Sequence, residues 1–370
     1  MKPATMGAFD KIKRRNLDYL LIETIKQIGV SNYSLLARMT GINPETVRYK
    51  VNKQLTKYGL GVQVNLNHAE LGMSAGLMVV DAEPSQEWLG EVSYLFFEGK
   101  AIGASKYVGL YAVPFRFKKK YIDVMSFLKQ QKRITDYAIY EAKWLRYPSF
   151  RPEFYDFDAK KWKVDWRRVE MTQGESGATT LDVNRDAEVD YMDVKILKAM
   201  QENPTVSIVK VAAEIGANPR TLRYHNAEHV VKGKLILNSN VRWKRPAIEG
   251  KPGELMQMLT LVKGVGQEGV VKTRKVMNKI PFTWLEGGSE VGDYFALLDV
   301  PMDKLYETTR YIESNTEDVR SSLSIIMLDS QKSRYLHIPE EMFDPKRGWT
   351  LPSYRQEMAK IGDGEERRHS

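Results

Sequence analysis

The sequence predicts an α+β protein in which one module, a helix-turn-helix head followed by a βαββαβ domain, occurs twice. The first observation is a repeated stretch. GINPETVRYK, residues 41–50, recurs without a gap as GANPRTLRYH, residues 216–225. The second observation is that the same series of strand-like and helix-like segments follows each copy, and the third is that a similar Pro…Trp stretch ends each half. Self-similarity of this kind indicates an internal duplication.

The composition is compatible with packed domains and a polyanionic partner. The 370 residues are 42% hydrophobic, which is enough for several buried cores. Lys and Arg number 56 against 47 Asp and Glu, and the formal net charge of +9 favours nucleic acid or another anionic partner. The absence of cysteine excludes disulfides, zinc fingers and thiol catalysis. No apolar run reaches membrane-spanning length and no signal-peptide pattern is present, so we expect a cytoplasmic protein without a membrane partner.

Each repeated stretch is typical of a helix with a DNA-facing front. Asn43 or Asn218 can cap the helix, and the proline that follows stands where a missing N–H costs nothing. Val47, Val51 and Leu55 recur every four residues and should be buried. The Thr, Arg, Tyr and Lys side chains elsewhere on the helix suit a DNA groove. An amphipathic helix with a solvated basic face is the alternative, and the duplication favours DNA recognition.

Around this helix, the pattern predicts a three-helix head in each half. Apolar residues recur at helical spacing over residues 10–28, and a second short helix is expected over 31–40, before the turn at Gly41. The same scheme returns 216 − 41 = 175 residues later. The alternating stretches 60–67 and 235–243 indicate a β-wing or a strand leading outward. We therefore predict two winged helix-turn-helix domains.

A series of strand, helix, strand, strand, helix and strand follows each head. This order predicts a ferredoxin-like domain, an antiparallel sheet with both helices on one face. The other face needs a cover, and one chain with two copies can cover itself. The expected strands are 74–82, 102–109, 110–117 and 137–145, then 255–264, 282–288, 292–300 and 321–329. The expected helices are 85–99, 119–133, 267–280 and 303–315.

The exits from the two domains repeat as well. PEFYDFDAKKW, residues 152–162, resembles PEEMFDPKRGW, residues 339–349, and each should form an ordered flap whose Trp packs onto the preceding sheet. The aromatic, basic stretch 159–168 is expected to pack in this way, in preference to stacking on bases. The predicted boundaries are 10–66 and 187–245 for the heads, 67–168 and 246–352 for the ferredoxin-like domains with their flaps, 169–186 for a linker and 353–370 for a tail.

This organisation resembles the leucine-responsive (Lrp/AsnC) regulators of bacteria and archaea. The motif P-x-T-[VL]-R-Y, at residues 44–49 and 219–224, is similar to the pattern in that family's DNA-reading helix. Gly292-Asp293-Tyr294 is similar to a stretch of its effector domain, the RAM or ACT-like ferredoxin-like fold. The resemblance implies double-stranded DNA as a partner, a nucleoid-associated location, self-association through the sheets and a small effector such as an amino acid. The chain departs from the family in being a fused pair and in carrying the flaps.

The resemblance therefore predicts a sequence-specific transcription regulator that is not an enzyme, with no cofactor, no bound metal and no catalytic residue. Because Glu45 stands where Arg220 does in the other copy, the two heads are expected to read an asymmetric DNA site. The expected DNA contacts are Thr46, Arg48, Tyr49, Lys50, Lys53, Arg220, Thr221, Arg223, Tyr224 and His225, with Lys57 and Lys232 touching the DNA backbone.

His225, Glu228 and His229 spell H-x-x-E-H, a pattern found in zinc peptidases. The first copy carries no such motif, and only two plausible metal ligands are close in sequence. We therefore expect no stoichiometric zinc, and a histidine facing DNA is preferred to a ligand.

Gly264, Gly266 and Gly269 form a G-x-G-x-x-G loop between a predicted strand and a predicted helix. The βαββαβ order does not fit a dinucleotide fold, and the first half has no glycines at this loop. Free amides at a helix start can still hold a carboxylate, so Gly264 and Gly266, with Gly292 and Asp293, are the candidate effector site.

An enzyme is the competing interpretation. Siroheme-decarboxylase-like enzymes of haem biosynthesis share the head-plus-ferredoxin-like build, and fold alone does not separate the two functions. Such an enzyme would need basic and histidine residues that converge between the sheets on a porphyrin-sized pocket. The βαββαβ segments contain no histidine and their basic residues are typical of helix surfaces, so the sequence favours the regulator.

Overall fold

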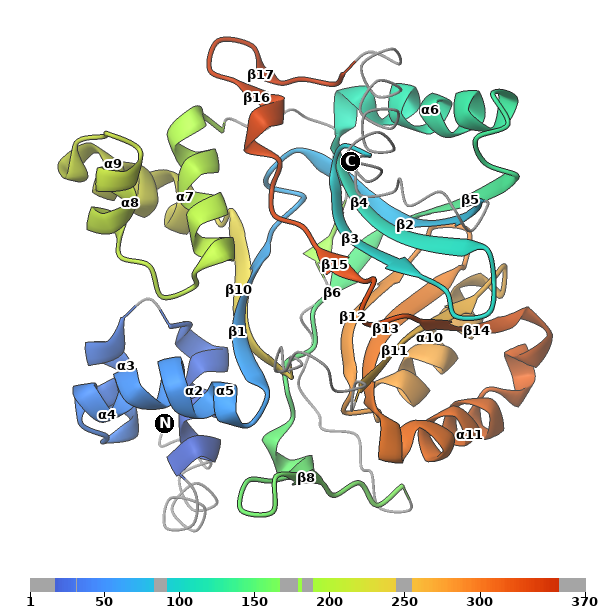
Figure 1. Cartoon of the computed structure of the whole chain (residues 1–370), viewed down its shortest axis with the longest axis horizontal. Helices are drawn as coiled ribbons and strands as arrows, with labels where there is room; N and C mark the ends of the chain where they lie inside the picture. Colours follow the sequence, from blue (N-terminus) through green and yellow to red (C-terminus); the bar gives the residue numbers. More distant parts are fainter. Residues whose placement is uncertain are drawn as a thin grey trace, which may run out of the picture.

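The computed structural model describes residues 17–30, 32–82, 92–166, 179–181, 189–243 and 255–352. It confirms an α+β fold with an internal duplication. Two small helical heads lie on one side of the molecule and two antiparallel sheets lie on the other (Figure 1). The predicted linker lies almost wholly outside the described residues. The predicted tail and the last two residues of the stretch 159–168 also lie outside them.

Both heads have the predicted three-helix build. The first contains α2 (Leu17–Ile28), α3 (Tyr33–Thr40), α4 (Pro44–Tyr49), a π turn (Lys50–Gln54) and α5 (Leu55–Lys57). The second contains α7 (Tyr191–Glu202), α8 (Ile208–Glu214), α9 (Pro219–His225) and a π turn (Asn226–Lys232). The side chains of Asn43 and Asn218 cap the third helices, as predicted. Val47, Val51 and Leu55 are buried in the first head, which confirms the apolar face.

The strand that follows each head does not fold back as a wing. Instead, β1 (Leu60–Leu66) pairs with β10 (Ile236–Trp243), antiparallel, and the two form a ribbon of their own. Val64 lies opposite Ser239 and Asn65 lies opposite Asn238, pairs that are 175 and 173 residues apart, on either side of the offset of 174 that links Gly59 to Gly233. The pseudo-twofold axis of the duplication therefore passes between these two pairs. The ribbon lies between the heads and the sheets (Figure 1).

The second half forms the predicted βαββαβ domain. Its elements are β11 (Leu255–Val262), α10 (Gly266–Met277), β12 (Thr283–Gly288), β13 (Tyr294–Pro301), α11 (Leu305–Asn315) and β14 (Leu323–Leu328). The strand order β14-β11-β13-β12, antiparallel throughout, is the ferredoxin-like order.

The first half has the same sheet, with three corrections to the prediction. Its elements are β2 (Met73–Asp81), β3 (Leu95–Lys100), β4 (Lys106–Pro114), α6 (Lys118–Gln130) and β5 (Asp136–Glu141). Residues 95–99, expected to end a helix, belong to strand β3. The two strands expected over 102–117 are a single strand, β4, preceded by a turn. The strand expected over 137–145 ends at Glu141, and residues 144–146 form a separate strand of the other sheet. Of the remainder of the predicted helix, residues 92–94 form a turn, and residues 85–91 lie outside the described residues.

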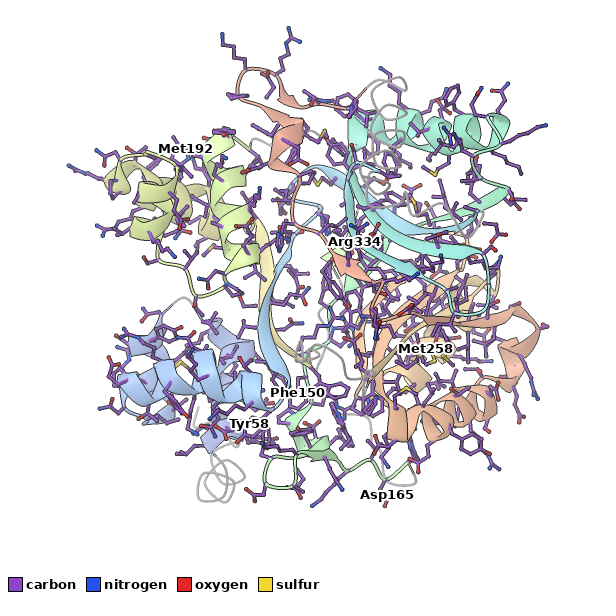
Figure 2. The ribbon with its side chains drawn as sticks, in the orientation of Figure 1. Tyr58, Phe150, Asp165, Met192, Met258 and Arg334 are labelled. Atoms are coloured by element: carbon purple, nitrogen blue, oxygen red, sulfur yellow. The ribbon has the colours of Figure 1, made fainter. Side chains whose placement is uncertain are left out.

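The two halves exchange strands. Strand β6 (Trp144–Arg146) leaves the first half and pairs with β12 of the second sheet, where β9 (Thr179–Thr180) extends it. Reciprocally, β15 (Arg334–Tyr335) leaves the second half and pairs with β3 of the first sheet. Figure 2 labels Arg334 on this exchanged strand, at the centre of the molecule. The faces of the two sheets also pack on each other, with the rings of Phe97 and Trp284 5.5 Å apart.

The flaps follow the same exchange. Each is a small hairpin, β7 (Tyr155–Asp156) with β8 (Lys161–Trp162), and β16 (Phe343–Asp344) with β17 (Gly348–Trp349). Trp162 is buried against Phe282 of the second half, and Trp349 is buried against Tyr94 of the first. The prediction that flap tryptophans pack is confirmed, but each packs on the other half and not on the preceding sheet.

None of the helices in the described part of the chain has both the length and the apolar character needed to cross a membrane.

Candidate functional site

A cavity of about 290 Å³ lies where the β1–β10 ribbon meets both sheets. Residues from both halves line it, and the exchanged segment around β15 covers part of it. The lining comprises Gln63, Val64, Asn65, Leu66, His68, Phe96, Tyr147, Gln201, Arg242, Leu255, Gln257, Trp284, Asp299, Ser330, Ser333, Tyr335, Leu336 and His337.

The first half contributes a histidine held between two aromatic side chains. His68 follows β1 and is buried, and its ring stacks on Phe96 at a centroid distance of 5.1 Å. Its Nε2 lies 3.2 Å from the hydroxyl oxygen of Tyr147. Burial lowers the pKa of His68 from 6.5 to about 4, because the charged imidazolium would lose its solvation. His68 is therefore a neutral imidazole near pH 7.

The second half contributes an arginine in the corresponding setting. Arg242, at the end of β10, is buried, and its guanidinium carbon lies 3.8 Å from the ring centre of Trp284 and 4.2 Å from that of Tyr335. Its Nε donates to Asp299 at 2.8 Å, and a second nitrogen donates to both Asp299 and the Tyr335 hydroxyl. Its remaining nitrogen, Nη1, makes a contact of 3.4 Å to Gln63. A buried positive charge thus faces the cavity with its own counterion.

Sheet pairing shows that these two settings are equivalent. Arg146 lies opposite Glu286 on β12, as Arg334 lies opposite Glu98 on β3. Tyr147 and Tyr335 are the next residues along the chain after these arginines. Phe96 and Trp284 likewise each stand two residues before the glutamates. The pseudo-twofold axis therefore relates a His–Phe–Tyr cluster in one half to an Arg–Trp–Tyr cluster in the other.

Several buried polar atoms around the cavity lack a protein partner. Among the described residues, no hydrogen-bond partner exists for His68 Nδ1, Gln257 Oε1 or Trp284 Nε1. Buried polar groups in native proteins are nearly always paired, and an orphan costs about 1–3 kcal/mol. Three such atoms around one cavity indicate a place for a polar ligand or ordered water.

The residues predicted to contact DNA divide into two groups. Most of them are exposed on the third helices or just after them, where a partner could reach them: Thr46, Arg48, Tyr49, Lys53, Lys57, Arg220, Thr221, Arg223, Tyr224 and Lys232. Their DNA contacts stay predictions.

Lys50 and His225 instead face inward, which corrects their predicted orientation. The ammonium of Lys50 donates to Asp18 of α2 at 2.6 Å, and its side chain is only 12% exposed. His225 Nδ1 lies 3.2 Å from the equivalent aspartate of α7, Asp193, which is fully buried. In each head, the buried aspartate therefore contacts a lysine or histidine side chain at the end of the third helix. The physical reason is helical spacing: Lys50 lies three residues after buried Val47 and shares its face.

The H-x-x-E-H motif also differs from its predicted use. Glu228 accepts a hydrogen bond from Lys232 at 2.6 Å and is not part of the histidine cluster. His225 and His229 meet Asp190 and Asp193 instead, with all four ligand-capable atoms within 4.8 Å of one another. The hydrogen bond that His229 donates to the Asp193 carboxylate raises the pKa of His229. The fold therefore adds two possible ligands that are distant in sequence to the two histidines that are local.

The four residues of the predicted effector site, Gly264, Gly266, Gly292 and Asp293, lie close together as expected. The carboxylate of Asp293 itself, however, accepts the hydrogen bonds that the loop offers. Asp293 Oδ1 accepts from the amide of Gly264 at 2.9 Å, and its Oδ2 accepts from Ser289 at 2.9 Å. A Cβ atom on Gly292 would lie 2.4 Å from backbone atoms of Gly266, so the turn is tightly closed. Effector binding at these four residues stays a prediction, and an effector carboxylate would have to displace Asp293.

Sequence reasoning missed the cavity because its key residues lie outside the βαββαβ segments. His68 precedes β2 and Arg242 ends β10, so both stand on the connections from the heads. The βαββαβ segments contain no histidine, as the sequence shows, but His68 reaches the cavity from just before β2. A usable signal was the offset of 174 that links Gly59 to Gly233 after the heads, because it matches His68 with Arg242, two residues of different chemistry.

Comparisons with known proteins identify the fold. No protein-family model matches the sequence, and no curated protein matches it. The crystal structure of the siroheme decarboxylase NirDL aligns over 95% of this chain and 100% of its own, with a TM-score of 0.54 and 11% identity. A second structure of that enzyme, in co-complex with an iron-uroporphyrin III analogue, aligns over 94% and 99%, with a TM-score of 0.54 and 12% identity.

Single-module regulators align with only part of the chain. The leucine response regulatory protein LrpA of Mycobacterium tuberculosis covers 34% of this chain and 90% of its own, at a TM-score of 0.26 and 20% identity. AsnC of E. coli covers 37% and 95%, at a TM-score of 0.27 and 18% identity. The chain therefore has, over its full length, the fold of the siroheme decarboxylase NirDL, and its own two sheets show the duplication.

Proposed function

We propose that the chain binds a tetrapyrrole carboxylic acid in the central cavity and removes a carboxyl group from it, as a siroheme-decarboxylase-like enzyme. The observation that carries this proposal is the convergence of buried Arg242, neutral His68 and three unpartnered polar atoms on one cavity between the halves. The full-length likeness to a decarboxylase supports it. An asymmetric, aromatic and partly cationic pocket suits a flat ligand with several carboxylates.

The shape of the cavity bears on how such a ligand would enter. Ligand pockets are commonly about 300–1,000 Å³, so a cavity of about 290 Å³ holds one edge of a macrocycle but not all of it. The covering residues Ser330 to His337 reach this pocket from the exchanged segment. We expect this segment to move aside when the ligand binds.

The chemistry needs a carboxylate held in place and a proton delivered. In decarboxylation the bond between the methylene carbon and the carboxylate carbon breaks, CO₂ leaves, and the electron pair stays on the methylene carbon, conjugated with the ring. A proton then adds to this carbon and gives a methyl group. Arg242 Nη1 has donor capacity toward the cavity and is the candidate anchor for a ligand carboxylate.

His68 and Tyr147 are the candidate proton-transfer pair. They are hydrogen-bonded at 3.2 Å and both line the cavity. Burial raises the pKa of Tyr147, so its hydroxyl keeps its proton. His68 Nδ1 has no partner in the described part of the chain, so it is able to relay a proton to a bound substrate.

Titration of the purified chain with an iron-uroporphyrin III analogue tests the binding step. We expect a shift of the Soret absorption band at one ligand per chain. With siroheme under reducing conditions, we expect products lighter by one or more molecules of CO₂. His68→Gln should keep the Soret shift and lose at least tenfold in turnover, whereas Arg242→Lys should weaken binding.

His229→Gln, a histidine replacement outside the cavity, is the matched control and should leave turnover unchanged. If the wild-type chain shows no Soret shift with either tetrapyrrole, the proposal fails.

DNA-binding regulation is the competing proposal, and the exposed fronts of both third helices favour it. The side chain of Arg48 is 58% exposed and carries an ion pair of 3.3 Å to Glu45, and Arg223 is exposed at the matched position. Arg48→Ala or Arg223→Ala should weaken operator binding by about 1–3 kcal/mol. Selection of genomic fragments with the purified chain measures this, and failure to enrich any sequence would remove the regulator.

A further inference from the structure

The second head contains a compact cluster of two histidines and two aspartates. Asp190 caps α7, Asp193 lies one turn further on, and His225 and His229 project from α9 and the π turn after it. His225 Nδ1 lies 3.2 Å from Asp190 Oδ2 and 3.2 Å from Asp193 Oδ1. His229 Nδ1 lies 3.0 Å from Asp193 Oδ2 and 3.8 Å from Asp190 Oδ2. The histidine rings are 4.7 Å apart.

These separations are close to those among the ligands of a small tetrahedral cation. Zinc binds histidine nitrogen and carboxylate oxygen at about 2.0–2.2 Å, which sets neighbouring ligand atoms roughly 3.3–3.6 Å apart. The nitrogen–oxygen separations of 3.0–3.8 Å, which involve both oxygens of Asp193, bracket this range, and one ligand atom from each residue lies within 4.8 Å of the others, so a small contraction would complete the tetrahedron. Both histidines present the same ring atom, Nδ1, to the same two carboxylates. The donor set, two nitrogens and two carboxylate oxygens, suits zinc-like ions.

The first head provides an internal comparison. Asp18 occupies the place of Asp193, and the ammonium of Lys50 neutralises it at 2.6 Å. The amide of Gln54 and the hydroxyl of Tyr58, each at 2.9 Å, complete the shell around the Asp18 carboxylate. In this head, the ammonium of one lysine therefore compensates the charge of one buried carboxylate.

The second head keeps the carboxylate and loses that cation. At the offset of 175 residues, His225 replaces Lys50 and His229 replaces Gln54, while Asp190 adds a second carboxylate. Asp193 is fully buried, so its charge needs compensation. One divalent cation would cancel the charge of −2 on the two carboxylates.

We propose that Asp190, Asp193, His225 and His229 bind one zinc-like divalent cation. The ion joins the start of α7 to the third helix of the second head, at the point where the first head uses the Lys50–Asp18 ion pair. Its role is to hold the third helix against α7, which keeps the surface that carries Arg223 and Tyr224 in one orientation. The site is distinct from the central cavity, and it needs neither tetrapyrrole nor DNA.

The test begins with the untagged chain, stripped with a chelator and dialysed against zinc. Elemental analysis should find one zinc per chain, and cobalt in its place should give the strong visible bands of a tetrahedral ion. Zinc at about a hundredfold its dissociation constant should raise the melting temperature by about 5 °C.

The matched variant H225K/H229Q copies the first head, where lysine and glutamine occupy these positions in a folded structure. It should fold, bind no zinc and show a melting temperature that does not respond to zinc. Asp190→Asn retains a good helix cap and removes one charge, so it should fold and bind zinc at least tenfold more weakly. His337→Gln, a histidine on the rim of the cavity, should bind zinc as the wild type does.

Less than one tenth of a zinc per chain in the reloaded wild type, with no cobalt spectrum, would overturn the proposal. The cluster would then be hydrogen-bonded only. Stoichiometric zinc that persists in H225K/H229Q would place the ion elsewhere and would overturn it equally. Neither result bears on the Soret titration, so the two proposals fail separately.

Discussion

The two halves of the cavity have the same framework and different chemistry. Tyr147 and Tyr335 stand at equivalent positions on the exchanged segments, but one holds His68 and the other holds Arg242. A homodimer would place two histidines or two arginines on the axis, because both subunits share one sequence. Fusion into one chain lets one half supply a neutral acid–base group and the other a fixed positive charge.

The largest expected effect comes from removing the positive charge that distinguishes the second half, at Arg242. Arg242→Asn takes away the cation that contacts buried Asp299 and puts no charge in its place. The free energy of unfolding should fall by about 3–5 kcal/mol, because a buried charge is left uncompensated. Urea unfolding measures this. The double variant with Asp299→Asn should recover a large part of the loss, and equal losses in the single and double variants would contradict the argument.

The second prediction concerns pH and the histidine half. The pKa of His68 is about 4 in the folded chain and 6.5 in the unfolded chain, so the unfolded state binds more protons between these values. The contribution of His68 to the free energy of unfolding should therefore be fully present above about pH 6.5, and it should fall by about 3 kcal/mol as the pH drops to 4. In His68→Gln, the free energy of unfolding should change by about 3 kcal/mol less over this pH range than it does in the wild type. An identical pH dependence in the variant would show that His68 is not the group.

The smallest effect compares the two exchanged strands. Arg146 is 6% exposed and binds fully buried Glu286 at 2.6 Å, whereas Arg334, which binds Glu98, is 50% exposed. Arg146→Met should destabilise the chain more than Arg334→Met does, since Arg146 is buried and Arg334 is half exposed. The difference should be only about 1 kcal/mol, because Arg274 still contacts Glu286 at 3.1 Å. Parallel thermal unfolding of the two variants gives the difference. Equal losses would mean that exposure does not distinguish the strands.

The fold was largely predictable because duplication and helix signals are local. The caps at Asn43 and Asn218 and the apolar face through Val47 were readable from spacing alone. Strand β3 was missed because its continuous apolar residues have no alternation to separate them from a helix. Strand β4 was divided at Gly109, whose bare backbone in fact packs closely against Met78.

The site was less predictable because it depends on pairings between distant residues. Nothing local marks the exchange of β6 and β15, which brings Tyr147 and Tyr335 to the cavity. The inward direction of Lys50 was the exception, since its spacing of three residues from Val47 already placed it on the buried face. His68 and Arg242 could be recognised as site residues only when the sequence offset was combined with their positions in the structure.

The reciprocal strand exchange has a consequence for synthesis on the ribosome. The first sheet is complete in β2, β3, β4 and β5 once residue 141 has been made, but the edge of β3 receives its partner only from Arg334 and Tyr335. For nearly two hundred residues of translation, about 10–40 s at typical rates, that edge is open to other chains. The nascent first half is therefore expected to need chaperone protection until the last part of the second half emerges.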